Sequence, residues 1–125
     1  MALSPNAKVV KYLMDPSDES DFYFGFSELA EGESIATFSV VPHAESAALG
    51  LTVGTSSRAP YLATRTEEGE TTSGVAFWLS IAEEFHSNVI FDNDGTKLGV
   101  VIKIVTTATP SRTFERSLAV IVANR

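Results

Sequence analysis

The chain has 125 residues, no cysteine and a formal net charge of −7, from 9 Lys and Arg against 16 Asp and Glu. A chain of this length forms about one domain, and the lack of cysteine excludes disulfides, thiolate metal sites and a cysteine nucleophile while leaving the redox compartment open. The acidic balance argues against nucleic acid as a partner, because binding phosphates requires Lys and Arg. No apolar run approaches ~20 residues and residues 1–15 lack a signal-peptide pattern, so we expect a soluble protein with no membrane partner, not exported by that route.

Residues 1–14 contain a short apolar run, formed by Val9, Val10, Tyr12, Leu13 and Met14. An apolar stretch at a chain end must be covered by something. The run is therefore either a first strand or a terminal arm that orders on a partner, and the sequence leaves both interpretations open.

Residues 15–33 hold seven acids and neither Lys nor Arg, arranged around an aromatic block. Alternation places Phe22, Phe24 and Phe26 on one face of a strand and Tyr23 on the other. Residues 27–30 predict a single helical turn capped by Ser27, and residues 31–33 predict a chain reversal.

Four strands are predicted in the middle of the chain, at residues 34–42, 49–53, 61–64 and 75–79. Pro42 ends the first of them by removing an amide donor. The last has apolar residues on both faces, which is typical of a central strand, and it contains Trp78.

Residues 81–96 predict a short helical turn and then a hairpin, with residues 88–91 as a strand and residues 93–95 as the turn. A long strand follows at 98–104, then a turn at 109–111. Leu118, Val120 and Val122 form the core face of the last strand. Seven or eight strands without a long amphipathic helix indicate an all-β sandwich.

Candidate chemistry is sparse. The acids of residues 15–33 offer oxygen ligands, but residues 92–95 lack EF-hand spacing, so solvated loop charge is the better interpretation. His43 and His86 stand outside any recognisable catalytic signature, and residues 54–58 lack the second Gly of a nucleophile elbow. Glycoside hydrolysis requires two carboxyl groups at a set distance. That distance depends on the fold and not on the spacing of acids in the sequence, so the sequence does not identify such a pair. We expect no enzyme activity, no metal and no cofactor.

Arg112 and Arg116 point the same way along a strand, toward the side that becomes the core at Leu118. An inward-facing arginine at the end of a sandwich extends its guanidinium to the rim or pairs with an acid while its stem packs on aromatics. We expect a structural role for both, with Arg116 paired to an acid from residues 15–33.

Five short motifs follow one another along the chain: an Asp-Pro with acids and an aromatic strand (15–24), LAEGESI (29–35), Gly-Leu-Thr (50–52), Trp-Leu-Ser (78–80) and Arg-Thr-x-x-Arg-Ser-Leu-x-hydrophobic-x-Val (112–122). Together they resemble a family of small tailed-bacteriophage virion proteins, described as fiber-tail adaptor or Ig-like phage structural proteins. The chain departs from the family in having Pro110-Ser111 before the first closing Arg. It also has a longer segment at 81–96, where loop insertions are tolerated and build binding surfaces.

The resemblance implies an Ig-like antiparallel β-sandwich over residues 15–125 and a non-enzymatic virion component in the tail, assembled in the host cytoplasm. Its role would be to link tail fibers to the tail or its adaptor ring, in several copies per particle. A capsid decoration (cement) protein is the main alternative. A carbohydrate-binding module would need exposed aromatics on one face, for which Tyr12, Tyr61 and Trp78 are the candidates. We expect Trp78 to be structural, because it lies on the predicted central strand.

The expected contacts with other tail, adaptor and fiber proteins lie on residues 1–14 and on the 81–96 loop. Both segments carry apolar residues that a minimal sandwich does not need, and these form the predicted partner-binding set: Val9, Val10, Leu13, Ile81, Phe85 and Val89.

Overall fold

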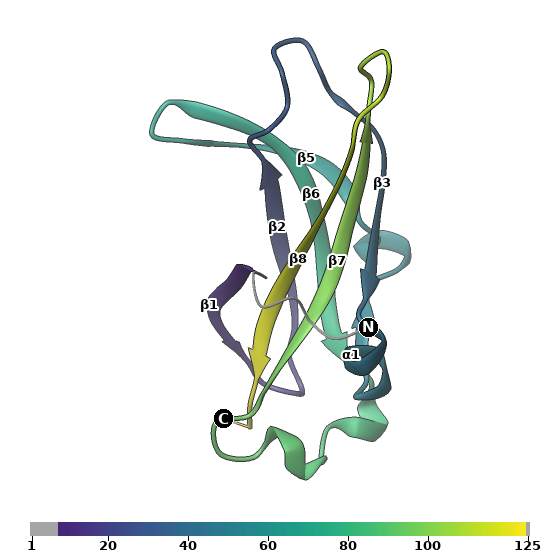
Figure 1. Cartoon of the computed structure of the whole chain (residues 1–125). Helices are drawn as coiled ribbons and strands as arrows, with labels where there is room; N and C mark the ends of the chain where they lie inside the picture. Colours follow the sequence, from purple (N-terminus) through teal and green to yellow (C-terminus); the bar gives the residue numbers. More distant parts are fainter. Residues whose placement is uncertain (1–7, 125) are drawn as a thin grey trace.

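Strands with alternating apolar side chains pack face to face in this protein, whose computed structural model describes residues 8–124 (Figure 1). One sheet has the strand order β1-β8-β7-β3, comprising β1 (Lys8–Met14), β8 (Thr113–Val122), β7 (Thr96–Thr106) and β3 (Ile35–Pro42). The other has the order β2-β6-β4, comprising β2 (Glu19–Phe26), β6 (Glu70–Ile81) and β4 (Leu51–Val53). A further strand, β5 (Tyr61–Glu67), pairs with β6.

This strand order is that of an immunoglobulin-like sandwich. In that fold the second, fifth and fourth strands share one sheet and the third, sixth and seventh share the other. Here β2, β6 and β4 occupy the first set of places, and β3, β7 and β8 occupy the second. The predicted Ig-like sandwich is therefore confirmed, with one difference: β1 pairs with β8 in parallel, so the first sheet is not wholly antiparallel.

The core lies where the inward faces of the two sheets meet. Side chains of β6, β7 and β8 supply most of it, and those that are almost fully buried include Val75, Phe77, Leu79, Leu98, Val100, Ile102, Ile104, Leu118, Val120 and Val122. The period-two alternation predicted for these three strands is confirmed. β6 is central, as expected, because it pairs with β2 on one side and with β4 and β5 on the other.

Short helical segments occupy the loops: α1 (Ala44–Ala48), η1 (Ser56–Arg58), η2 (Glu83–Phe85) and η3 (Val89–Phe91). The helical turn predicted after residue 81 is present as η2. The strand predicted at residues 88–91 is wrong, because this stretch forms a 3₁₀ turn. The Asn88 side chain accepts a hydrogen bond from the Ile90 amide at 3.0 Å, and Phe91 turns inward and is fully buried.

Two other predictions need correction. Residues 27–30 form a plain turn, not a helical one, and the chain reverses through Gly32, whose φ of 79° is left-handed. β5 continues three residues beyond the predicted end and forms a hairpin with β6 through Glu68 (φ 52°) and Gly69 (φ 81°). Positive φ at both central residues is the geometry of a tight two-residue hairpin loop.

Residues 8–14 form a strand of the first sheet, which agrees with the first-strand interpretation for this part of the chain. The rest of the predicted arm, residues 1–7, lies outside the described residues. Figure 1 shows the loops after β2 and β7 at one end of the sandwich and the η2–η3 segment at the other.

Candidate functional site

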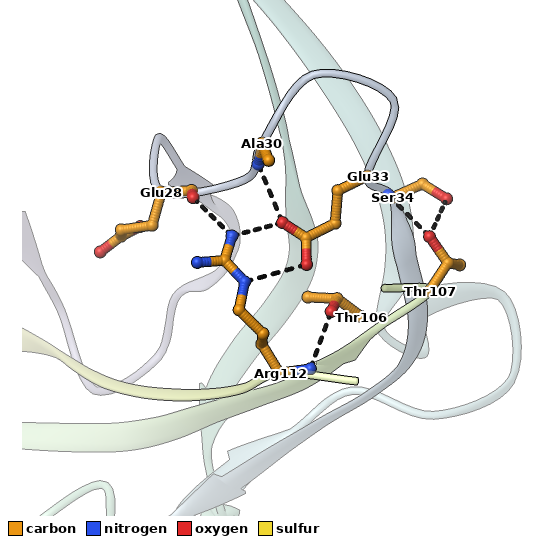
Figure 2. A network of polar contacts seen from close by, with 7 residues as sticks. All are labelled: Glu28, Ala30, Glu33, Ser34, Thr106, Thr107 and Arg112. Atoms are coloured by element: carbon orange, nitrogen blue, oxygen red, sulfur yellow. Dashed lines mark hydrogen bonds and ion pairs between the residues drawn. The ribbon is translucent and has the colours of Figure 1, made fainter. Parts of the chain in front are cut away.

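A hydrogen-bonded junction joins the two loops at the end of the sandwich where β8 begins (Figure 2). The guanidinium of Arg112 donates to both carboxylate oxygens of Glu33, with Nε 3.1 Å from Oε2 and Nη2 bonded to Oε1, and also to the carbonyl of Glu28 at 2.9 Å. The Ala30 amide donates to Glu33 at 2.8 Å. The Arg112 amide donates to the Thr106 hydroxyl at 3.0 Å. The link after β2 and the link before β8 are thereby fixed to each other.

Hydrogen bonding determines the pKa of Glu33 in this junction and outweighs the opposing effect of burial. The Glu33 side chain is only 4% exposed although that of Arg112 is 45% exposed. Hydrogen bonds from Arg112, and then from the Thr106 hydroxyl and the Ala30 amide, lower the pKa of Glu33 to about 2. The same pair raises the pKa of Arg112 above its ordinary value.

Arg116 forms a second ion pair beside the first. Its Nη2 lies 2.7 Å from Oε2 of Glu28, and this hydrogen bond lowers the pKa of Glu28. The guanidinium carbons of Arg112 and Arg116 lie 4.9 Å and 5.5 Å from the ring centre of Phe114. The expected pairing of Arg116 with an acid from residues 15–33 is confirmed. The sequence also placed Arg112 at this rim, but it did not single out Glu33 as its partner.

Trp78 lies on the outward face of β6, opposite the inward-facing Phe77 and Leu79. The guanidinium carbon of Arg58 lies 5.0 Å from its ring centre, and Arg58 is held by an ion pair to Glu19 at 2.8 Å. The ring is therefore capped by a cation, which suits a structural role and disfavours a sugar-stacking platform.

The other two aromatics considered for sugar binding are exposed but do not share a face with each other. Tyr61 lies on β5 in the second sheet, whereas Tyr12 lies on β1 in the first sheet and donates to Asp18 at 2.6 Å. A single flat aromatic surface is not assembled from these three residues.

The predicted partner-binding residues divide into two groups. Val9, Leu13 and Val89 are exposed, and Val89 most of all at 78%. Val10 packs partly against the core. The remaining two, Ile81 and Phe85, belong to the core or pack against it, which corrects the prediction that they form a contact surface.

Ile81 is only 4% exposed and pairs with Leu51 across the β4–β6 ladder, so it belongs to the core and not to a contact surface. Phe85 packs against the core and lies over Gly50, where an added Cβ would stand 2.7 Å from its ring. Their apolar character is explained by the fold. On this loop the exposed apolar residues are instead Val89 and its neighbour Ile90, which the sequence had assigned to a strand.

Each of the two histidines has a ring nitrogen within hydrogen-bonding distance of another group in the protein. His43 is buried, with Nε2 3.3 Å from the Ser117 hydroxyl, and its Nδ1 has no hydrogen-bond partner in the described part of the chain. A Ser-His-acid arrangement requires a carboxylate at that second nitrogen. His86 bonds the Ile81 carbonyl at 2.6 Å.

The acids before β2 organise a turn. Asp15 accepts from the Ser17 amide at 2.9 Å, and Asp18 accepts from the Asp15 amide at 3.0 Å. Within residues 8–124, no three His, Asp or Glu side chains are grouped so as to hold a metal ion. Over the same residues, no helix has the length and apolar character to span a bilayer.

A groove at the open side of the sandwich was not anticipated from the sequence. It has a volume of about 460 Å³ and lies between the start of β3 and the edge of β5, lined by Ser34, Ile35, Leu62, Ala63, Thr64, Ser73 and Gly74. Leu62 is 45% exposed there. The sequence predicts the short strand at 61–64 that forms one wall of this groove, but it does not show that the edge of this strand has no neighbour.

Comparison of the chain with protein-family models, with curated proteins and with solved structures finds no match.

Proposed function

We propose that this protein is a non-enzymatic structural component of a bacteriophage virion, an adaptor that joins tail fibers to the tail or its adaptor ring. The observation that carries the proposal is the Arg112–Glu33 pair. Glu33 belongs to the LAEGESI stretch and Arg112 to the closing Arg-Thr-x-x-Arg stretch, two of the motifs on which the family resemblance rests. Two motifs 79 residues apart meet in one contact, which supports the view that they form a common structural signature.

The form of the molecule suits a linking role. The loops at one end are fixed by the ion pairs of Arg112 and Arg116, while the opposite end presents the η3 turn with exposed Val89 and Ile90 (Figure 1). An exposed apolar pair on a rigid scaffold is a suitable anchor for a protein neighbour. Repeated copies in a ring would strengthen each such contact through high effective concentration.

The test is the location and amount of the protein in particles. We expect the double variant Val89→Ser/Ile90→Ser to fold normally and to be depleted from purified tails, as measured by quantitative mass spectrometry. Val41→Ser is the matched control, because Val41 is 55% exposed but belongs to β3 and not to η3. Imaging of labelled particles supplies the position: label on the head shell would replace the adaptor role with a decoration role.

A shortened chain tests the arm separately. Deleting residues 1–7 leaves β1 and its ladder with β8 in place. Normal incorporation of that truncated protein would show that the arm is dispensable, and depletion would assign it a contact. Binding to a glycan array with no incorporation into particles would instead favour the carbohydrate-binding alternative.

A further inference from the structure

Five strand edges in the described part of the sandwich have no neighbouring strand, and an open edge invites pairing with another chain unless it is disrupted or covered. Two of them carry a break in register: β1 between Val9 and Leu13, and β3 between Ile35 and Thr37. Such irregularities twist an edge away from a partner. A third edge, that of β4, is only 3 residues long.

The edge of β2 is covered by side chains of β1. The Tyr12 ring centre lies 6.2 Å from that of Phe22, and the Lys8 ammonium lies 5.8 Å from the ring centre of Phe24. A strand approaching β2 would have to displace both side chains. Four of the five edges are thus short, irregular over part of their length, or flanked by side chains of another strand.

The fifth edge, that of β5, has none of these protections. β5 is 7 residues long, has no proline, and keeps an unbroken register with β6 from Tyr61 opposite Ala76 to Glu67 opposite Glu70. Its sequence, YLATRTE, contains one Arg and one Glu, so the edge is locally neutral although the protein carries a net charge of −7.

The outward backbone groups of β5 follow from its hairpin. In a hairpin with a two-residue loop, the residues flanking the loop form a hydrogen-bonded pair, and such pairs then alternate along the ladder. Counting back from Glu67, the amides and carbonyls of Leu62, Thr64 and Thr66 point away from β6. They are the groups that a further strand would bind.

Side chains beside this edge add an apolar contact. Leu62 faces the same side of the sheet as Val75, toward the gap between the two sheets, and is 45% exposed. The groove of about 460 Å³ between β3 and β5 lies next to it, with Ile35 and Thr64 on its walls. The edge thus offers both a protruding apolar side chain and a recess.

We propose that two copies of this protein associate by antiparallel pairing of β5 with β5 of the second copy, with Ala63 opposite Ala63. In this register Leu62 of each copy stands opposite Thr64 of the other and enters the other's groove. The same patch serves both copies, as a two-fold interface requires.

Charge is compatible with this register and disfavours registers displaced toward the hairpin tip. The acids at the hairpin tip, Glu67, Glu68 and Glu70, lie beyond the paired stretch and point away from one another in the two copies. Registers centred on Arg65 or Glu67 would instead set like charges directly opposite each other, which destabilises a ladder. A neutral edge is also the part of an acidic protein that a second copy can approach most easily.

A disulfide tests the register directly, because the chain has no cysteine of its own. Ala63 opposite Ala63 is a non-hydrogen-bonded pair, with Cα atoms about 4.5 Å apart, which is within the range that a disulfide bridges. We expect Ala63→Cys to form a disulfide-linked dimer readily under mild oxidation. The control Val41→Cys, which is on β3 and more exposed than Ala63, should remain largely monomeric; equal cross-linking of both variants would overturn the proposal.

Sedimentation of the unmodified protein tests the association itself, and we expect a mass near twice 13.4 kDa at micromolar concentrations. Thr64→Pro removes an outward amide without touching the β5–β6 ladder, and Leu62→Lys removes the apolar contact; each should raise the dissociation constant by about tenfold. Val41→Lys makes the same charge change elsewhere and should leave the dissociation constant unchanged. A monomer at every concentration would refute the pairing, as would variants that dimerise normally.

The pairing stands independently of the proposed virion role. Circular dichroism verifies that each variant is folded, and if Thr64→Pro fails to fold, the disulfide result decides. A dimer in a protein absent from particles would refute only the adaptor role, and a monomer found in tails would refute only the pairing.

Discussion

Glu33 is the residue whose ionisation the fold depends on most directly. Its pKa is lowered to about 2 from an ordinary 4.5, so its ionised form is stabilised by folding. The stability that it contributes is present above about pH 4.5 and is lost as the pH falls through that value toward 2. We expect the melting temperature of the wild-type protein to fall over this interval, in part through this group.

The variant Glu33→Gln isolates this contribution. Gln keeps the shape and an acceptor but cannot ionise, so we expect a lower melting temperature than wild type at pH 7 and a difference that shrinks between pH 4.5 and 2. Glu31→Gln is the matched control, because Glu31 lies two residues away in the same loop and is exposed. A wild-type-minus-variant difference that stays constant across this interval would contradict the role assigned to Glu33.

Arg116 anchors the last strand more weakly than Arg112 does. Its ion pair with Glu28 is exposed on both sides, at 38% and 39%, and such pairs contribute little. With the lost contact to Phe114, we expect Arg116→Ala to lower the unfolding free energy by about 1 kcal/mol. Arg112→Ala should destabilise the protein further, because it leaves the nearly buried Glu33 carboxylate without its cation. Denaturant titration measures the unfolding free energy of both variants, and an unchanged transition in Arg116→Ala would refute the anchoring role of Arg116.

At the scale of the elements, the sequence predicted the strands that are buried and missed the features that depend on distant partners. β6, β7 and β8 bury one face against the other sheet, so their alternation is strong. The second half of β5 is polar on both faces because it extends beyond the other sheet (Figure 1), and it was missed for that reason. The sequence predicts a strand at η3 because Val89 and Ile90 have high strand propensity, while the burial of Phe91 depends on Asn124, which is distant in the sequence.

The candidate sites show the same division. Alternation was sufficient to set Arg112 and Arg116 at the rim and to expect an acidic partner for Arg116. It was not sufficient to find the open edge of β5, because which edges lack a neighbour depends on the pairing of all eight strands in the described part of the chain. The sequence places Ile81 on a surface because it does not reveal that β4 pairs beside this residue.

The packing of β2 against β6 makes Gly74 another critical position at the element scale. A Cβ on Gly74 would meet the Phe24 carbonyl oxygen and would lie 2.8 Å from both the Gly25 Cα and the Tyr23 ring, so a side-chain movement alone would not relieve the two backbone contacts. We expect Gly74→Ala to cost about 3 kcal/mol, the upper end for overpacking. In Gly69→Ala the added Cβ meets nothing within 4 Å, and only the backbone cost of about 1 kcal/mol remains. Equal denaturation midpoints for the two variants would show that β2 can move away from β6.

For the whole molecule, charge determines how the proposed pairing responds to salt. Each copy carries a net charge of −7, so two copies repel at long range, whereas the paired edges attract through hydrogen bonds and the burial of Leu62. The Debye length falls from about 30 Å at 0.01 M salt to about 10 Å at 0.1 M, which screens the repulsion but leaves short contacts intact. We therefore expect the dissociation constant of the dimer to fall severalfold over this range of NaCl, measured by sedimentation. An association held by ion pairs would weaken instead, so a dissociation constant that rises with salt would rule out pairing through the neutral β5 edge.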